Sequence, residues 1–483
     1  AGLTCPAAAQ QPGLVKAEQH PPLPLKVCTA ARGCDVVEAT GVTLDAGRRW
    51  LHDRRWGPDA EAGEFGGCGG PGAWNATLCP DPESCAANCA LEGLSLSEYE
   101  ANYGVSAEGG GIRIAYVTKE TNVGSRLYLT DEARPGAYRA FHLKNREFAF
   151  TVDVSSLDCG LNSALYFVEM PVNGGKGVGN NNAGALYGLG YCDARCPHEV
   201  PFIDGHANMQ GKSGSCCTEM DLFEANRMAA SMTAHPCSMT GECQGIACGD
   251  GPAHQYYQGV CDKDGCEFNS YRLGDSTFYG PGATVDTTKP VTVVTQFYTD
   301  DGTDSGRLSE IRRFYVQDGR VIPNSKSRLA SVPGDSLSPG TCSAQKAAFV
   351  RTRADPAGEY NQFDAKGGLG AMGEAFDRGM VLVLSLWDDE AMHMEWLDSR
   401  LPHGLPPGTP GALRGPCEVG WGTPAWMRKH RQDAHTRFWD LRLGEIGSTQ
   451  QGAPAAAAAA GEAGEVAAPL VQLAANTVLA SSS

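Results

Sequence analysis

The feature that most restricts the fold of this 483-residue chain is a period-two alternation of apolar side chains in many short segments. Clear examples are residues 112–116, 148–154 and 291–297. At 438–441 the same alternation predicts that Phe438 and Asp440 share one face of a strand. Connections rich in Gly, Pro and Asn separate these segments, and long helical patterns are scarce. The pattern predicts an all-β protein in which two antiparallel sheets pack as a sandwich or jelly roll.

The charge balance excludes several partners. The chain has 39 Lys and Arg against 56 Asp and Glu, a formal net charge of −17, which repels phosphate backbones and anionic lipid surfaces. No run of 18 apolar residues and no basic, Leu-rich opening is present. We therefore expect a processed chain with neither nucleic acid nor a membrane as its partner.

Nineteen cysteines spread along most of the chain indicate an oxidising compartment. We expect a secreted, extracellular protein. Zinc is the rival interpretation of clustered cysteines such as Cys192, Cys196, Cys216 and Cys217, but the adjacent pair does not readily chelate one ion. Disulfides are the favoured interpretation. Spacing alone does not determine their pairing, because six cysteines already allow 15 arrangements.

Long connections and a biased tail divide the chain into regions. Residues 168–190, 237–271 and 398–416 form unusually long connections, which on a β scaffold commonly build a binding surface. From residue 449 the composition collapses into Ala, Gly and Ser. We expect one large domain over residues 1–448 and a disordered tail over 449–483 without a carbohydrate-binding module.

Three carboxylates in one predicted strand carry the strongest functional signal. Glu219 and Asp221 are two residues apart and share a face, but Glu224 follows Glu219 at an odd interval and falls on the other face. One extra residue, a β-bulge between Asp221 and Glu224, would bring all three together.

With that bulge the two glutamate Cα atoms lie roughly 13 Å apart, and side chains leaning inward bring the carboxyl groups to about 5 Å. Retaining glycosidases need about 5–5.5 Å, so that one carboxylate attacks the anomeric carbon directly. Asp221 would orient Glu219, and Glu224 would act as general acid and then base. A solvated acidic row or a calcium site is the alternative.

Several motifs then identify a family. They are GSCCTEMD at 214–221, HPC at 235–237, YRLG at 271–274, FYGPG at 278–282 and GMVLVLSLWDD at 379–389. Together they resemble glycoside hydrolase family 7, the secreted cellobiohydrolases and endoglucanases that attack cellulose, over about residues 5–448. The resemblance implies a curved β-jelly roll with long loops roofing a substrate groove, with Glu219 as nucleophile, Asp221 as its helper and Glu224 as acid/base. No metal and no cofactor are implied.

The resemblance also implies the contacts of a glucan chain, which is flat and uncharged and needs aromatic faces and polar forks. Trp50, Trp387 and Trp396 match platform tryptophans, whereas Trp74 and Trp439 are assigned to the core. His235 would lie near the leaving-group side. The other expected contacts are Arg126, Asn162, Tyr166, Tyr191, Asp193, Asp264, Glu267, Arg272 and Arg414. The chain departs from the family at Arg48, where many members have Trp, and at Tyr256, which stands where a product-side Arg is usual.

Nine disulfides follow from the same resemblance. They are Cys28–Cys34, Cys68–Cys89, Cys79–Cys85, Cys159–Cys417, Cys192–Cys217, Cys196–Cys216, Cys237–Cys261, Cys243–Cys248 and Cys266–Cys342. Cys5 is left over as a free or intermolecular thiol, and we expect a monomer.

The loops decide between two modes of attack. The short segment 211–214 opens the middle of the groove, whereas 237–261 and 397–417 resemble full cellobiohydrolase loops, and 51–68 and 348–366 are long. We expect a cellobiohydrolase that releases cellobiose from reducing ends of cellulose in a partly open tunnel. The alternatives are an endo-β-1,4-glucanase with an open cleft and, in another class, a non-catalytic glucan-binding jelly roll.

Overall fold

The computed structural model describes residues 10–57, 66–119, 122–251, 253–349, 361–406 and 408–450. Cys5 and the tail from residue 451 lie outside the described residues, as do parts of the segments 51–68 and 348–366. Within the described ranges, no helix has the length and apolar character needed to cross a membrane.

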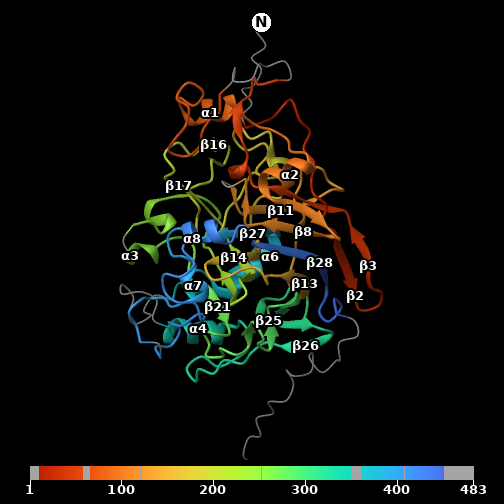
Figure 1. Ribbon diagram of the computed structural model, residues 1–483, viewed down its shortest axis with the longest axis vertical. Helices are drawn as coiled ribbons and strands as arrows, with labels where there is room; N and C mark the ends of the chain where they lie inside the picture. Colours follow the sequence, from red (N-terminus) through yellow and green to blue (C-terminus); the bar gives the residue numbers. More distant parts are fainter. Residues whose placement is uncertain are drawn as a thin grey trace, which may run out of the picture.

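Two large sheets form the body of the molecule (Figure 1). The front sheet has eight strands, in the order β21 (Cys266–Asn269), β19 (Ala230–His235), β18 (Glu219–Ala225), β14 (Leu161–Val168), β27 (Met380–Asp388), β11 (Ser125–Asp131) and β4 (Thr40–Leu44), with β12 (Ala140–Phe141) paired to β27. The back sheet has nine strands, in the order β26 (Arg320–Pro323), β25 (Leu308–Gln317), β24 (Val291–Thr299), β13 (Arg146–Asp153), β28 (His435–Glu445), β2 (Leu25–Thr29) and β3 (Gly33–Glu38), with β8 (Gly111–Ala115) against β28 and β7 (Val105–Glu108) against β8.

Short elements surround the two sheets. The helices are α1 (Pro82–Asn88), α2 (Leu96–Tyr103), α3 (Ala253–Tyr256), α4 (Pro339–Ala348), α5 (Gln362–Ala365), α6 (Gly368–Arg378), α7 (Glu395–Asp398), α8 (Pro424–His430) and the 3-10 turns η1 (Ala46–Arg48), η2 (Gly184–Tyr187) and η3 (Gly245–Cys248). The short strands are β1 (Gln11–Pro12), β5 (Leu51–Asp53), β6 (Cys89–Leu91), β9 (Val117–Thr118), β10 (Asn122–Val123), β15 (Phe202–Ile203), β16 (His206–Ala207), β17 (Ser213–Cys216), β20 (Gly241–Gln244), β22 (Tyr279–Gly280) and β23 (Val285–Asp286).

The predicted sandwich is confirmed, and its core lies between the two sheets. Alternate residues of β14, such as Leu165 and Phe167, face that core, where Phe167 meets Phe148 of β13 at 5.3 Å between ring centroids. The large sheets are antiparallel except where β2 runs parallel to β28. Every residue of β14 is buried, because loops cover the face of the front sheet that points away from the core.

Strand β28 corrects one detail of the predicted alternation. Phe438 and Leu441, not Phe438 and Asp440, face the core together. The register with β13 shifts between Ala149 and Thr151, and Asp440 adopts a positive φ of 55°. A β-bulge therefore interrupts the period of two at this point.

Two tryptophans assigned to the core are only partly buried. Trp74 packs against a small second cluster and donates from Nε1 to the carbonyl of Asn208 at 3.1 Å. Trp439 lies in β28 with the guanidinium of Arg437 4.5 Å from its ring centroid. An amphipathic indole suits such half-buried positions, because its apolar ring is covered while its N–H reaches a polar partner.

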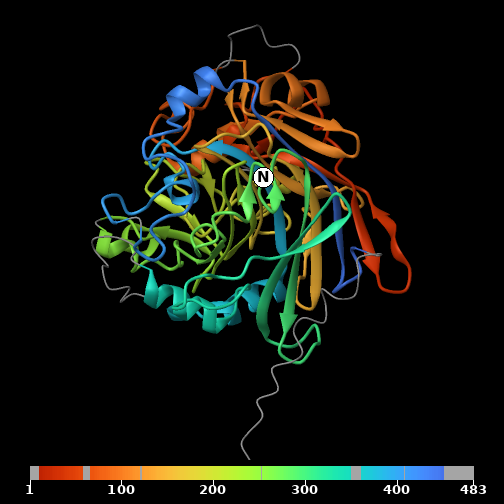
Figure 2. The same ribbon diagram turned by 60° about the horizontal axis from the view of Figure 1, so that its bottom comes forward.

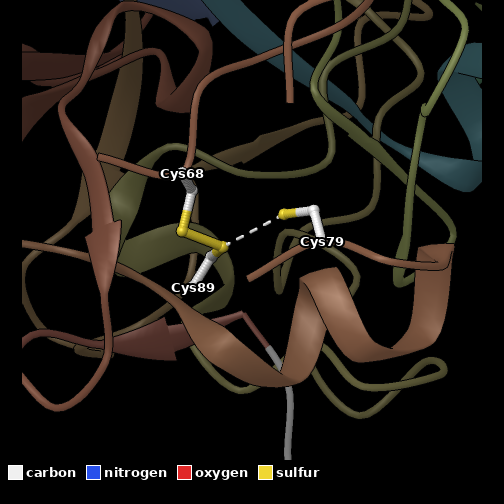
Figure 3. A group of neighbouring side chains, drawn as sticks. All are labelled: Cys68, Cys79 and Cys89. Atoms are coloured by element: carbon white, nitrogen blue, oxygen red, sulfur yellow. Dashed lines mark hydrogen bonds between the residues drawn. A yellow bond between two sulfur atoms is a disulfide. The ribbon is translucent and has the colours of Figure 1, made fainter. Parts of the chain in front are cut away.

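All nine expected disulfides are present in the described residues. Some lie close together: Cys79 Sγ is 3.6 Å from Cys89 Sγ of the neighbouring bond (Figure 3). Such clusters bring three cysteine sulfurs within reach of one another, but their members are already in disulfides and offer no thiolate to zinc. The disulfide interpretation is confirmed.

Candidate active site

The face of the front sheet away from the core carries rows of polar side chains from neighbouring strands. Directly opposed residues on paired strands point to the same face. One row runs through Glu267, Thr233, Asp221, Tyr166, Val383 and Tyr128. The row on one side of it holds Ser231, Glu224, Ala164, Ser385 and Arg126, and the row on the other side holds His235, Glu219, Val168 and Val381.

The predicted bulge in β18 is confirmed. Asp221 pairs with Tyr166 of β14 and Phe223 pairs with the next residue, Leu165, so Leu222 has no partner on that strand. The register with β19 shifts between Asp221 and Glu224. Because of this extra residue, all three carboxylates lie on one face of the sheet while Met220, Leu222 and Phe223 enter the core.

Glu219 and Asp221 are almost completely buried, at 7% and 3% exposure. Glu219 Oε2 accepts the backbone N–H of Ala194 at 3.0 Å. Asp221 Oδ2 lies 3.1 Å from His235 Nε2, and the other ring nitrogen of His235 lies 2.8 Å from the carbonyl oxygen of Asp262. Since both nitrogens face acceptors, the ring is best satisfied as the imidazolium, with both nitrogens donating.

Glu224 is held by Asn162 of β14. The amide of Asn162 donates from Nδ2 to Glu224 Oε1 at 3.0 Å, and its Oδ1 accepts the backbone N–H of Ala225 at 3.0 Å. Asn162 therefore fixes Glu224 and the end of the bulged strand at once. It was expected as a substrate contact, and the structure gives it this second, positioning contact.

These carboxyl groups are buried without enough positive charge nearby, and this raises their pKa values. Burial, then repulsion from Asp221, raises the pKa of Glu219 well above its usual value. Burial and then Asp221 raise the pKa of Glu224 to about 8, and burial raises that of Asp221 although His235 opposes the shift. Burial lowers the pKa of His235, but its contact with Asp221 outweighs this and raises it to about 8. The cluster thus holds protons at neutral pH, as groups that transfer protons require.

A tyrosine and arginine cluster lies beside Glu219. Tyr191 donates from its hydroxyl to Asp193 Oδ2 at 2.7 Å and is 2.9 Å from the hydroxyl of Tyr166. The guanidinium of Arg126 lies 3.6 Å from the centroid of the Tyr191 ring, and its Nε donates to Asp45 Oδ2 at 2.9 Å. The structure therefore brings these four predicted groove residues together.

A second cluster lies beyond Glu224. Glu267 accepts from Ser231 Oγ at 2.9 Å, is bonded to Arg272 and lies 3.4 Å from Arg414 Nη1. Arg414 also donates to the carbonyl of Trp396 at 3.1 Å, and the Trp396 ring stacks on Trp387 at 6.2 Å between centroids. These five predicted residues are contiguous.

Trp50 and Asp264 have other neighbours. Trp50 is 48% exposed and packs on His52 and Trp56. Asp264 interacts with Tyr256, whose pKa is raised by burial and by Asp264. Arg48, which stands where many family members have Trp, donates to the carbonyl of Val123 at 3.2 Å.

Sequence reasoning missed several polar residues of this face, among them Ser231, Thr233, Ser385, Asp45 and Tyr128. Ser231 and Thr233 are 3.0 Å apart through their hydroxyls and continue the face of His235 along β19. Asp45 and Tyr128 both contact Arg126. The alternation of Ser231, Thr233 and His235 with buried Met232 and Ala234 is the signal that would have found the first two.

A β-sandwich that displays buried, proton-holding carboxylates beside stacked tryptophans on one face has the make-up of an enzyme that hydrolyses carbohydrate. Comparison with known proteins agrees. The sequence profile of Glycosyl hydrolase family 7 matches residues 12–450. The chain therefore belongs to glycoside hydrolase family 7 and is a glycosidase.

Solved structures of both kinds of cellulase resemble it. A cellobiohydrolase of this family from Daphnia pulex is 43% identical with a TM-score of 0.84, covering 91% of this chain and 100% of its own. The endocellulase EGI of Humicola insolens is 38% identical with a TM-score of 0.75 and the same coverage of both chains. A cellobiohydrolase from Melanocarpus albomyces, complexed with cellotetraose, is 34% identical with a TM-score of 0.78, covering 91% of this chain and 99% of its own.

Proposed function

We propose that this enzyme hydrolyses the β-1,4-glucosidic bonds of cellulose with retention of configuration, and that it does so from reducing chain ends, releasing cellobiose in a partly open tunnel. The observation that carries the chemistry is the bulge at Leu222, which puts Glu219, Asp221 and Glu224 on one face. It supports the separation of about 5 Å that direct attack on the anomeric carbon requires.

In the first step, the carboxylate of Glu219 attacks the anomeric carbon while Glu224 gives its proton to the departing glycosidic oxygen. A pKa of about 8 keeps Glu224 protonated for this task at neutral pH. Glu219 must be ionised to attack, although burial raises its pKa. Asp221, which is hydrogen-bonded to Glu219, takes over the proton that Glu219 gives up, and the His235 imidazolium beside Asp221 balances the negative charge left on Glu219.

In the second step, water attacks the glycosyl-enzyme ester. Glu224, now a carboxylate, removes a proton from this water, and Glu219 leaves as a carboxylate. The proton balance closes, because Glu224 regains the proton that it gave away. Two inversions at the same carbon restore the original anomeric configuration.

Loop structure supports the cellobiohydrolase mode. Disulfides Cys237–Cys261 and Cys243–Cys248 brace the connection before β21, and Cys159–Cys417 ties the loop after α7 to the start of β14. Long, braced loops suit the roof of a tunnel. The Daphnia pulex relative is named a cellobiohydrolase. Nine disulfides support secretion.

An endo-acting glucanase with an open cleft is the second candidate. The short segment before β17, which begins at Ser213, favours it, as does the likeness to a Humicola insolens endocellulase. Family membership favours either enzyme over a non-catalytic glucan-binding protein. A monomer acting on cellulose and cello-oligosaccharides, with residues 449–483 as a tail outside the catalytic domain, completes the proposal.

The decisive experiment replaces the proposed nucleophile. Glu219→Gln should reduce cellotetraose hydrolysis by at least about 10⁴-fold while oligosaccharide affinity stays within a few fold, because the amide fills the same space and does not attack. Product anomers followed by NMR should show the β form first. Unchanged hydrolysis in the variant, or α-anomer as the first product, would overturn the mechanism.

The mode of attack needs a separate measurement. Mostly cellobiose from crystalline cellulose, with little loss of viscosity from carboxymethyl cellulose, supports exo action. A rapid fall in viscosity supports the endo-acting alternative.

A further inference from the structure

Two exposed tryptophans lie side by side away from the carboxylates. Trp421 is 51% exposed and Trp426 is 37% exposed, and their ring centroids are 6.0 Å apart. His430, one turn after Trp426 on α8, stacks on it at 4.6 Å with an interplanar angle of 24°. We call Trp421, Trp426 and His430 the tryptophan platform. Figure 2 shows the blue helix α8 at the outer edge of the molecule.

The backbone beneath this platform is firmly held. Cys417 is bonded to Cys159, and Gly420 donates its N–H to Glu395 Oε1 at 2.7 Å. A Cβ at Gly422 would lie 2.5 Å from the carbonyl oxygen of Cys159, so this turn packs directly on the neighbouring chain. The rings are thus presented on a rigid support, which lowers the entropy lost when a ligand binds.

The arginines around the platform are neutralised. Arg428 donates to both carboxylate oxygens of Asp388 at 2.7 Å and lies 2.6 Å from Glu390. Arg431 is bonded to Asp158 while its guanidinium lies 5.5 Å from the Trp426 ring. The two indole rings, tilted by 47° to each other, offer aromatic faces beside paired arginines, and such faces suit an uncharged ligand with apolar ring faces, such as a glucan.

The platform is also joined to the groove. Asp388, the partner of Arg428, ends β27 and follows Trp387, which stacks on Trp396 in the candidate active site. Asp388 also accepts the hydroxyl of Tyr116 at 2.6 Å, so the strand end is fixed between two elements. One carboxylate therefore couples the helix that carries Trp426 to the strand that carries a groove tryptophan.

We propose that the tryptophan platform is a second glucan-binding surface, outside the groove, that docks the enzyme on the face of insoluble cellulose through ring stacking. The identity of the ligand rests on the proposed function. The platform holds the enzyme on the polymer surface while the groove takes a single chain. Soluble oligosaccharides, which reach the groove without docking, do not need it.

The test compares adsorption with turnover in the full chain. Trp421→Ala/Trp426→Ala should lower the partition coefficient on microcrystalline cellulose, measured at low temperature, by about tenfold, equivalent to about 1.4 kcal/mol. kcat/KM on cellotetraose should stay unchanged. Trp421→Phe/Trp426→Phe should restore most of the adsorption, because the aromatic faces remain.

Val419→Ala is the matched control, since Val419 is 49% exposed in the same loop but is aliphatic, and its adsorption should equal that of the wild type. Unchanged adsorption of the double alanine variant overturns the proposal. An equal fall of adsorption and cellotetraose turnover also overturns it. So does light scattering that shows a dimer for the wild type and a monomer for the variant while adsorption persists.

These outcomes are distinct from failure of the proposed function. A wild-type chain that adsorbs through the platform but does not cleave cellotetraose refutes hydrolysis of cello-oligosaccharides and supports the platform. A chain that cleaves cellotetraose and adsorbs independently of Trp421 and Trp426 refutes the platform alone.

Discussion

The carboxylates of β18 and the carboxylate of β21 lie on the same face of the front sheet and differ in their proton affinity. Glu219 and Glu224 on β18 have pKa values raised by burial and by Asp221. Glu267 on β21 is as buried as Glu219, yet Arg272 and Arg414 outweigh the effect of burial and hold its pKa below the usual value. The presence of neighbouring cations, more than burial, therefore decides that Glu267 remains an anion whereas Glu219 and Glu224 can exchange protons.

Among the tests of this comparison, the largest effect is expected from removing the proton that Glu224 holds. Glu224→Gln should lower kcat on cellotetraose by about 10²–10⁴-fold, because the leaving oxygen then departs without a proton. An aryl cellobioside whose phenolate leaves without protonation should retain far more of its glycosylation rate. Pre-steady-state release of the phenol measures that step, and an equal loss on both substrates would contradict the role of Glu224.

Removing the negative charge of Glu267 should lower the stability of the fold. Glu267→Gln leaves Arg272 and Arg414 buried without their carboxylate, and breaking such a pair costs about 3–5 kcal/mol of unfolding free energy. Urea unfolding measures this. The matched control is Asp318→Asn, which breaks the exposed Lys289–Asp318 pair and should leave stability unchanged. A stable Glu267→Gln protein would show that the arginines do not depend on this carboxylate.

Asp398, another buried carboxylate, is held by two hydrogen-bond donors. Asp398 accepts from Gly160 N at 2.8 Å and from Asn226 Nδ2 at 2.7 Å, and burial raises its pKa to about 7 despite both bonds. A raised folded-state pKa means that its contribution to stability is full below the unfolded value near 4 and declines as pH rises through about 7.

Asp398→Asn should therefore flatten the stability profile. The asparagine Oδ1 accepts the same two bonds, so the variant should gain on the wild type as pH rises from 4 to 7, by about 1.4 kcal/mol for each pKa unit. Thermal unfolding across this range measures the difference. Parallel profiles for the two proteins would refute the shift.

The smallest effect concerns His235, the cation in contact with Asp221. The imidazolium of His235 lowers the pKa of Asp221, so His235→Asn should raise it and move the acid limb of kcat/KM to higher pH by about one unit. His198→Asn is the control, because His198 pairs with Asp250, 3.0 Å away and outside the carboxylate row. If the acid limb of the kcat/KM profile of His235→Asn stays at the wild-type pH, His235 has a purely structural role.

The sequence alone determined the sandwich, because alternation is local and each strand carries its own pattern. It also determined the bulge, since an odd interval between Glu219 and Glu224 leaves no other way to share a face. It did not reveal the bulge at Asp440, where no pair of functional residues marks the irregularity.

Only the tertiary structure decided which carboxylate has which proton affinity. Asn162 reaches Glu224 from 62 residues away, and Arg414 reaches Glu267 from 147 residues away. Such partners come from separate strands and loops, and no local pattern records them. The physical reason is that a pKa depends on burial and on charges within a few ångströms, and both are set when the two sheets and their loops pack together.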